Sequence, residues 1–376
     1  MKKHLKNVLL LSFGHVFLLI ISSFFLLRAI PYSGFFPYKE IAQMYHMNQF
    51  ITSLANFDGV HYLGIAERGY YQFEHAFFPL YPLLTRVFGL LFNNNLLISG
   101  LFISNIAFIM GLSFLSLVLS KMENKNSLPL LLLYIAFPTS FYFHTVYTES
   151  LFLFFFAGAL FFYQKKWWMW AGIFGFFSAL TRLFGVFLAG LFLYQAYLLY
   201  KKRGWTIFLL PLLPIAGFVL YALFLLITTG DPLAFFHAQS VFAERSTHLV
   251  LLPQVYYRYG KIIFSSQFSF AYIIACVELF LFTICMTGSV YEFIKKYKKW
   301  KEEPLSIFLA LFSILSILIP TLTGTFSSIP RYSLFAFSFF IALSHLSKKM
   351  RIGIGILFLA SQLILFGFFL QGYFVS

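Results

Sequence analysis

The sequence predicts an all-α integral membrane protein, and two observations carry that prediction. Hydrophobic residues fill 60% of the 376 positions and charged residues only 10%, a balance that a soluble domain of this size does not need. Several apolar runs also exceed about 18 residues, the length that crosses a bilayer as a helix. The net charge of +15 does not indicate a nucleic-acid-binding protein, because lysines between membrane spans act as a topology signal. We expect residues 1–376 to form a single transmembrane domain.

Polar and basic residues divide the apolar sequence into about eleven expected spans. The first follows the basic start MKKHLKN and resembles a signal peptide, but its long apolar core and the lack of a small-residue cleavage site favour a retained span. The expected spans cover residues 8–30, 96–120, 128–146, 148–163, 167–181, 183–200, 206–228, 269–294, 304–321, 332–347 and 352–373.

The distribution of basic residues indicates the orientation of these spans. With a cytoplasmic N-terminus, most of the 27 lysines and arginines fall in inner connections. A further span at residues 79–92 would move most of the lysines outside, so we expect only a shorter surface helix there. We therefore expect a multi-pass protein of the cell membrane whose functional site lies on the outer face, with residues 31–95 as its first outer loop.

The stretch that organises this outer loop is NFDGVHYLGIAERGYYQFEHAFFPLYPLL, residues 56–84. Asn56 can cap a helix, and Gly69 can end it in a left-handed turn. On that helix Asp58, His61 and Tyr62 share a face, because positions three and four apart are neighbours. The stretch predicts a short amphipathic helix at the membrane surface that presents a carboxylate and an imidazole.

The run FDGVHYLGIAERGY, followed by EHAFFP, resembles the first luminal loop of GPI mannosyltransferase 2, which adds the second mannose of the glycosylphosphatidylinositol anchor. That family has the pattern W-D-x-x-x-[FY]-x-x-I-A-x-x-G-Y with an acidic residue before F-F-P, and Phe57 departs from its Trp. The family's T-R-x-x-G pattern is matched by Thr181, Arg182 and Gly185. The short chain, rich in Lys, Asn and Phe, indicates a prokaryotic member. The loop positions that match are Asp58, Ile65, Ala66, Gly69, Tyr70, Phe77, Phe78 and Pro79.

The resemblance implies a GT-C-type polytopic bundle that transfers mannose from a polyprenyl-phosphate donor to a glycolipid or glycan acceptor. A site on the outer face cannot use nucleotide sugars made in the cytoplasm, which fits a lipid-linked donor. The expected partners are this donor, the acceptor and membrane lipids. We expect no cofactor, no metal ion and no nucleic acid, and the sequence identifies no protein partner.

Asp58 is the expected catalytic base, which takes the proton of the acceptor hydroxyl; its alternative role is a helix cap or an interfacial charge. His61 is expected to orient Asp58 or to bind the donor phosphate, unless it is simply an interfacial histidine. Glu74 and His75 match the family's acidic position and its neighbour. They are expected either to contact substrate or to maintain the structure of the loop.

Two arginines at outer ends of spans are candidates for contact with phosphate. Arg182 either contacts phosphate or sugar or extends to lipid headgroups, and Glu149 is its expected ion-pair partner. Arg331, in the run IPRY, is expected to bind the donor phosphate, as a late-loop basic residue does in many GT-C enzymes. A guanidinium binds phosphate in a two-pronged geometry that lysine cannot copy.

Two other classes of function stay open at this point. A transporter or flippase of a lipid-linked saccharide would place ionisable residues within spans near the bilayer midplane. Here most acidic residues fall in loops; Glu278 lies within a span and should have a partner there. A non-catalytic subunit of a transferase complex is the other alternative, and the presence of Asp58 argues against it.

The orientation can be tested with single cysteines at Gln72 and at Lys298 in a background that lacks Cys276 and Cys285. Because Gln72 belongs to the first outer loop and Lys298 to a basic inner connection, we expect impermeant maleimide to label them from opposite sides of sealed vesicles. Labelling of both positions from the same side would contradict the topology and the choice of a lipid-linked donor.

Overall fold

The computed structural model describes residues 2–34, 36, 38–123, 127–241, 245–246 and 248–375. Within these residues the regular structure is entirely helical, which confirms the predicted all-α class. The chain groups into two compact units, which we describe separately. Unit 1 comprises Met1–Leu128, Phe141–Ala238 and Gly367–Tyr373, and unit 2 comprises Pro129–Ser140, Gln239–Phe366 and Phe374–Ser376.

Unit 1 contains the long first helix, the short helices of residues 38–92 and a group of helices in the middle of the chain. Its α-helices are α1 (Lys2–Ala29), α2 (Tyr38–Tyr45), α3 (Gln49–Ser53), α4 (Asp58–Arg68), α5 (Leu80–Gly89), α6 (Leu96–Glu123), α8 (Glu149–Gln164), α9 (Trp168–Thr181), α10 (Leu188–Arg203), α11 (Leu209–Thr229) and α12 (Ala234–His237). Short 3-10 turns join them: η1 (Glu74–Ala76), η2 (Leu90–Phe92), η3 (Ser140–His144), η4 (Leu183–Phe187) and η5 (Trp205–Phe208).

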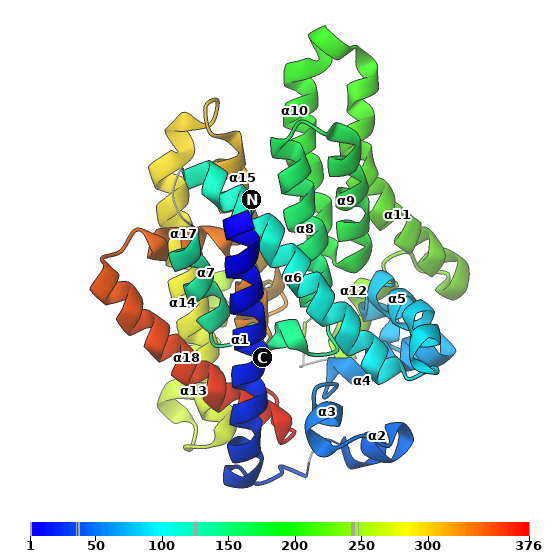
Figure 1. Cartoon of the computed structure of the whole chain (residues 1–376), viewed down its shortest axis with the longest axis vertical. Helices are drawn as coiled ribbons and strands as arrows, with labels where there is room; N and C mark the ends of the chain where they lie inside the picture. Colours follow the sequence, from blue (N-terminus) through cyan, green and yellow to red (C-terminus); the bar gives the residue numbers. More distant parts are fainter. Residues whose placement is uncertain are drawn as a thin grey trace. The chain divides into compact units, whose positions relative to one another are not determined.

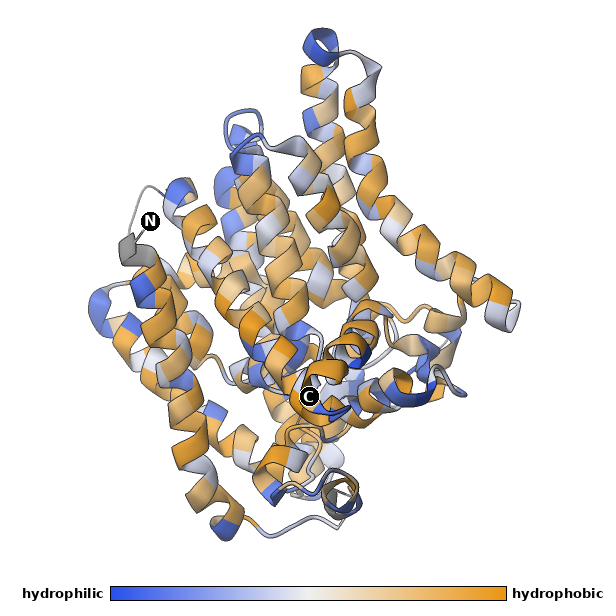
Figure 2. Ribbon diagram, turned by 45° about the vertical axis from the view of Figure 1, so that its right-hand side comes forward, coloured by the Kyte–Doolittle hydropathy of each residue, from blue (hydrophilic) through white to orange (hydrophobic). Residues whose placement is uncertain are grey.

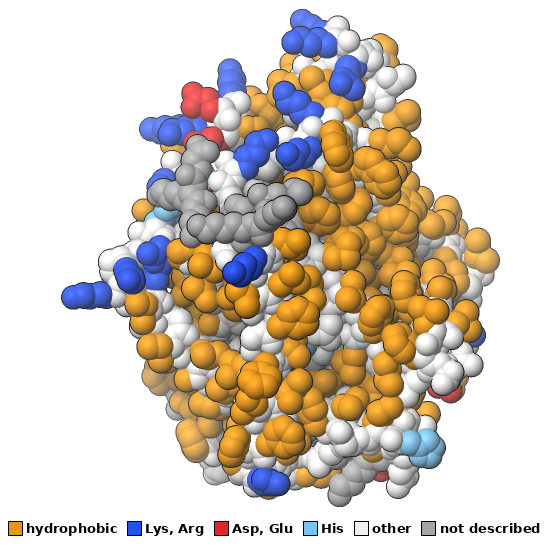
Figure 3. Space-filling view, in the orientation of Figure 1, with side chains coloured by type: hydrophobic (Ala, Val, Ile, Leu, Met, Phe, Trp, Pro, Cys, Tyr) orange, Lys and Arg blue, Asp and Glu red, His pale blue; other side chains and the backbone are white. Residues whose placement is uncertain are grey.

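The helices α6, α8, α9, α11 and α10 pack one against the next in that order (Figure 1). Glycines set the closest approaches: a Cβ added to Gly217 of α11 would lie 2.3 Å from the carbonyl oxygen of Phe176 in α9. Figure 2 shows that these helices are mostly hydrophobic, with hydrophilic residues gathered at the tip between α10 and α11. Lys201, Lys202 and Arg203 end α10 there, and Figure 3 shows basic side chains at that tip above an apolar surface.

Unit 2 contains the C-terminal helices together with a short helix from the middle of the chain. They are α7 (Leu128–Ala136), α13 (Leu252–Ser265), α14 (Phe270–Lys296), α15 (Pro304–Thr321), α16 (Ile329–Tyr332), α17 (Phe337–Ser344) and α18 (Lys348–Leu370), with the 3-10 turns η6 (Ala238–Val241), η7 (Tyr297–Lys299) and η8 (Ser333–Phe335). Within this unit α14 packs against α13, α15 and α17. A small core of Val255, Tyr259, Phe282 and Phe326 lies between α13, α14 and the loop before α16.

Seven helical segments of the described residues are long and apolar enough to cross a membrane. Three shorter apolar helices, Leu80–Phe92, Glu149–Gln164 and Trp168–Thr181, accompany them. The expected count of eleven is therefore not confirmed, although nine of the expected spans correspond to one of these helices. The seven segments are Leu5–Ala29, Leu96–Glu123, Leu183–Arg203, Trp205–Thr229, Phe270–Lys299, Pro304–Thr321 and Lys348–Leu370.

The two remaining expected spans, 128–146 and 332–347, are not continuous helices. Helix α7 ends at Ala136, and the Ser140 hydroxyl donates to the carbonyl of Tyr134 at 2.5 Å, which occupies an acceptor at the end of that helix. The Gln362 amide donates to the carbonyls of Ile135 and Phe137, so these freed groups are satisfied inside unit 2. The second run is broken near Ala336, whose ψ of +58° separates η8 from α17. Hydropathy alone could not detect these interruptions, because the broken segments remain apolar.

Candidate active site around helix α4

The candidate base, Asp58, is the first residue of α4 in unit 1. Its carboxylate is half-buried at the positive end of the helix dipole, which favours a negative charge there. Phe57, just before it, has a φ of +58° that a non-glycine residue adopts only where surrounding structure enforces it. The Phe57 ring packs between Phe36 and Phe369, with ring-centre distances of 4.7 Å and 6.0 Å. Tertiary packing therefore fixes the point at which α4 begins and the place of Asp58.

Asn56 does not cap this helix, contrary to the expectation from its residue type. Its side chain is fully buried and donates from Nδ2 to the carbonyl of Phe369 at 2.9 Å. Its backbone carbonyl accepts a hydrogen bond from the Tyr147 hydroxyl at 2.8 Å. Asn56 thus ties the start of α4 to two distant parts of unit 1. Gly69 does end the helix, as expected, but its φ of +86° and ψ of −175° are an extended glycine conformation and not the expected left-handed turn.

His61 and Tyr62, one turn beyond Asp58, have different neighbours. The His61 ring stacks on Phe77 at 5.1 Å, and its Nδ1 lies 3.4 Å from a carboxylate oxygen of Glu74. Tyr62 is buried, and its ring meets Phe77, Tyr81 and Tyr147 edge to face. His61 therefore faces the second half of the loop, whereas Tyr62 points into the helices of unit 1.

Glu74 closes the loop that follows α4. Arg68 donates to both of its carboxylate oxygens at 2.8 Å, and the backbone N–H of Tyr71 donates to one of them at 2.9 Å. We call these two hydrogen bonds from Arg68 the Arg68 fork. Gly64 leaves room for it, since a Cβ there would lie 3.0 Å from Arg68 Nη2. Burial alone would raise the pKa of Glu74, but these hydrogen bonds and that with His61 outweigh it and hold the pKa below its ordinary value of 4.5. The sequence did not predict Arg68 as the partner of Glu74, although the two residues are only six positions apart.

His75 lies beside Glu74 in the same 3-10 turn. Its ring stacks on Tyr70 at 5.3 Å, and its carbonyl accepts a hydrogen bond from the Tyr221 hydroxyl of α11 at 2.7 Å. Burial lowers the pKa of His75, in spite of the negative charge of Glu74. The imidazole is therefore held neutral at physiological pH, against a turn that α11 positions.

Arg182 and Glu149 form a buried ion pair, which confirms the predicted pairing. Arg182 Nη1 lies 2.5 Å from Glu149 Oε1, and these residues are only 9% and 1% exposed. Glu149 begins α8, and Arg182 directly follows α9 in an extended conformation. Gly185 makes this geometry possible, because a Cβ there would lie 2.3 Å from the backbone of Ser178 and Ala179. The T-R-x-x-G motif thus folds the chain back on the end of α9.

A hydroxyl-bearing residue joins this ion pair to α4. Thr148 Oγ1 accepts a hydrogen bond from Arg182 Nη1 at 3.4 Å, and the neighbouring Tyr147 packs edge to face against Tyr62 with ring centres 6.4 Å apart. Burial raises the pKa of Tyr62, and the charges of Asp58 and Glu149 raise it further while that of Arg182 lowers it. The structure therefore brings Asp58, Tyr62, Glu149 and Arg182 into one electrostatic neighbourhood. Helical spacing predicted Tyr62 on the face of Asp58, whereas no sequence pattern pointed to Thr148.

Arg331 belongs to unit 2, in the short helix α16. It is 8% exposed, and its backbone N–H donates to the carbonyl of Ser328 at 3.1 Å. Arg245 reaches the hydroxyl of the same Ser328 at 3.2 Å. Glu278 of α14 accepts a hydrogen bond from the Tyr259 hydroxyl at 2.5 Å, which confirms that this carboxyl group within a span has a partner.

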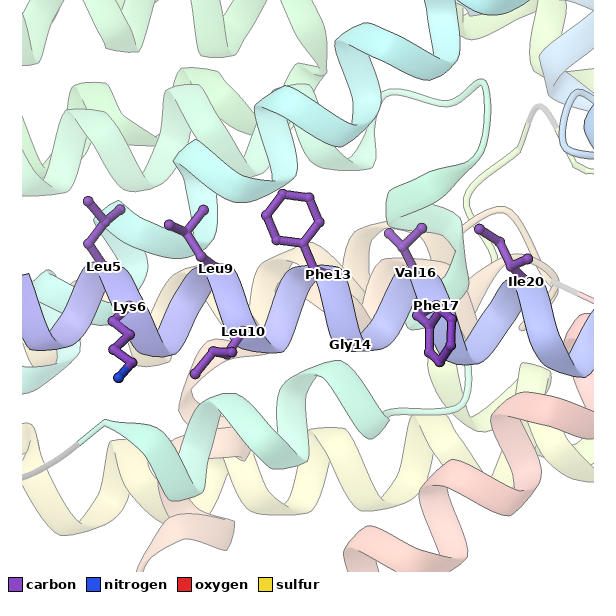
Figure 4. A pocket seen from close by; sticks show the side chains of 9 residues that line it. All are labelled: Leu5, Lys6, Leu9, Leu10, Phe13, Gly14, Val16, Phe17 and Ile20. Atoms are coloured by element: carbon purple, nitrogen blue, oxygen red, sulfur yellow. The ribbon is translucent and has the colours of Figure 1, made fainter.

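A hollow elsewhere in unit 1 is apolar. It runs along α1 beside residues 5–20, and Figure 4 shows its lining of apolar side chains with Lys6 near one end. It holds no carboxylate or imidazole for proton transfer. No group of three or more His, Cys, Asp or Glu side chains within the described ranges could hold a metal ion.

Residues 37–204 match the model of a family described as mannosyltransferase (PIG-V). This range contains Asp58, Glu74, Glu149 and Arg182 and excludes Arg331, so the match covers the set of residues assembled in unit 1. It confirms, over that range, the resemblance seen in the sequence motifs. No curated protein and no solved structure matches the chain. The match and the apolar helices together indicate a multi-pass membrane glycosyltransferase.

The contacts of Glu74 generate a test of the loop. Replacement Glu74→Gln removes the charge that receives the Arg68 fork, and we expect amide protection from hydrogen exchange in residues 69–78 to fall roughly tenfold at pH 7. Because the folded protein lowers the pKa of Glu74, its stabilisation is complete above 4.5 and is lost as the pH falls through the lowered value. Protection in the parent, corrected for intrinsic exchange, should therefore fall in acid, and Glu74→Gln should lack this dependence. The matched control is the exposed Glu67→Gln; equal protection in both variants would contradict the role of the fork.

Proposed function

We propose that the protein, whose residues 37–204 match the mannosyltransferase (PIG-V) family, transfers mannose from a polyprenyl phosphate to a glycolipid or glycan at the outer membrane face. The observation that carries this proposal is Asp58, a half-exposed carboxylate that begins α4 inside the matched range. A GT-C-type architecture and a prokaryotic source are parts of the same proposal. The lipid-linked donor follows from the proposed outer location, since nucleotide sugars are cytoplasmic.

The chemistry needs one proton acceptor and one site for the departing phosphate. The acceptor hydroxyl attacks the anomeric carbon, the carbon–oxygen bond to phosphate breaks, and the phosphate leaves with the bonding electron pair. Asp58 takes the hydroxyl proton, a role that suits a half-exposed carboxylate at a helix N-terminus. Arg331 is proposed to neutralise the charge on the departing phosphate.

The remaining candidate residues are proposed to shape the substrate surface around Asp58. His61 offers an imidazole that is partly exposed between Phe77 and Glu74, suited to a sugar hydroxyl or a phosphate oxygen. Glu74 and His75 form the turn next to it, so they contact substrate through the surface that the Arg68 fork stabilises. Arg182 is buried against Glu149, so it could contact phosphate directly only by binding Glu149 and the phosphate at the same time.

A transporter of a lipid-linked saccharide is the rival proposal, and Glu278 is the observation that favours it. This carboxyl group is buried within the span Phe270–Lys299, where ionisable residues mark transport paths. Its hydrogen bond from Tyr259 gives it a structural role, however, and the family match lies outside its part of the chain. Purified protein given polyprenyl-phosphate mannose and a glycolipid panel separates the two, because only an enzyme yields a product of increased mass.

The replacement Asp58→Asn tests the proposed base. It keeps the size of the side chain and removes its ability to accept a proton, so turnover should fall roughly 10²-fold or more with little change in donor affinity. Asp58→Glu should also be poor, because one methylene moves the carboxylate by about 1 Å. The measurement is transfer from polyprenyl-phosphate mannose by the purified protein.

The matched control for this series is Glu67→Gln, an exposed residue of the same helix, which should stay active. An Asp58→Asn protein that is folded, binds donor and transfers sugar at the parental rate would exclude Asp58 as the base. Glu74 would then be the next candidate.

Arg331→Lys and Arg331→Ala test the proposed phosphate contact. Lysine keeps the charge but loses the planar fork, so we expect Arg331→Lys to lose most activity and Arg331→Ala to weaken donor binding more than acceptor binding. KM values for donor and acceptor measure this difference. Normal turnover in both variants would return Arg331 to a structural or headgroup-contacting role.

A further inference from the structure

The Arg182–Glu149 ion pair is connected to α4 through Tyr147 and Thr148. Arg182 contacts Glu149 at 2.5 Å and Thr148 at 3.4 Å, and Tyr147, the residue before Thr148, packs edge to face against Tyr62 with ring centres 6.4 Å apart. Tyr62 stands one turn after Asp58 on α4, so the two side chains are neighbours on the helix surface. Three aromatic rings hold Tyr62 in place at its edges. The network is therefore rigid and contiguous from α9 to the start of α4.

We propose that Arg182, Glu149, Thr148 and Tyr62 form a positioning network that sets the electrostatic potential at Asp58. In this network the ion pair holds Thr148 in place, Thr148 orients the Tyr62 hydroxyl, and the dipole of that hydroxyl favours an anion at position 58. The role assigned here to Arg182 is to act through Glu149 and Tyr62 instead of touching the substrate. This inference rests on the proposed function of Asp58 as base, but its electrostatic content can be measured without any substrate.

Because the pair contains opposite charges, removing one or the other should change the stability of an anion at position 58 in opposite directions, which a purely structural role would not do. If Arg182 loses its charge, Glu149 is left uncompensated and an anion at position 58 becomes less favourable. If Glu149 loses its charge, Arg182 is left uncompensated and an anion at position 58 becomes more favourable. The charged or titratable neighbours among the described residues include Tyr81 and Tyr147, which pack on Tyr62, and His61, Arg68 and Glu74, which interact with one another at the far end of α4. Neither replacement changes these groups, so the sign of the effect identifies the pair.

The experiment places a titratable probe at position 58. Asp58→Cys is made in a background that lacks Cys276 and Cys285, and the rate of labelling by a methanethiosulfonate is measured against pH in the purified full chain. Because only the thiolate reacts, the midpoint of this curve reports the local potential. We expect Arg182→Gln to move the midpoint to higher pH and Glu149→Gln to move it to lower pH, each by about half to one pH unit. Shifts of the same sign, or no shift in either variant, would overturn the proposal.

Neutralising one partner of a buried pair can prevent folding, so a second pair of variants keeps the test decisive. Tyr62→Phe preserves the ring contacts and removes only the hydroxyl; we expect the labelling midpoint to rise, because a dipole that favours the anion is lost. The matched control is Tyr81→Phe, whose buried hydroxyl bonds to Gly100 and Ser104 instead of the network. This control should leave the midpoint unchanged. Equal midpoints in the Tyr62→Phe and Tyr81→Phe proteins would exclude the relay through Tyr62.

The transfer reaction distinguishes failure of this inference from failure of the proposed function. If Asp58→Asn abolishes mannose transfer but Tyr62→Phe leaves the rate per folded molecule and its acid limb unchanged, Asp58 is the base and the network is wrong. If the labelling midpoints shift as expected while Asp58→Asn stays active, the network exists but does not serve catalysis, which overturns its assignment as a positioning device. Both effects together support the full proposal.

Discussion

The buried ion pair between Arg182 and Glu149 is the constraint on which the candidate site depends. Two charges removed from water are tolerated only when each satisfies the other at close range, as these do at 2.5 Å. The requirement fixes the end of α9 against the start of α8, and Gly185 allows the chain to turn away at that point. Thr148 and Tyr62 then carry this geometry to the start of α4, where Asp58 lies.

Residues 141–150 show how an apolar bundle tolerates irregular backbone. All of them are buried, yet they contain no long helix. Their polar groups are satisfied from within unit 1: Val146 donates to the carbonyl of Leu54, and Ser104 donates to the carbonyl of Thr145. Because no water replaces such bonds inside a membrane, this segment is confined to the interior of the helices. It is therefore an inflexible support for the loop that carries Asp58.

The sequence predicted those features that depend on local pattern. The end of α4 at Gly69 follows from the conformational freedom of glycine, and the helical spacing of His61 and Tyr62 after Asp58 follows from periodicity. The pairing of Glu149 with Arg182 followed from two motifs, because few other charges were available there. Asn56 was assigned wrongly as a cap because its actual partner, the carbonyl of Phe369, lies 313 residues away. The place of Thr148 beside Arg182 was missed for the same reason, since only tertiary structure brings these two residues together.

The position of the ion pair also bears on how the protein enters the membrane. Glu149 stands at the start of α8 and Arg182 immediately after α9, so the two charges flank one pair of consecutive, unusually short apolar helices of 16 and 14 residues. A helix inserted alone would carry one uncompensated charge toward the bilayer, whereas the two inserted together carry none. Electrostatics thus favours insertion of α8 and α9 as a single unit. The same ion pair that holds the two helix ends together in the folded protein would then also hold them together during insertion.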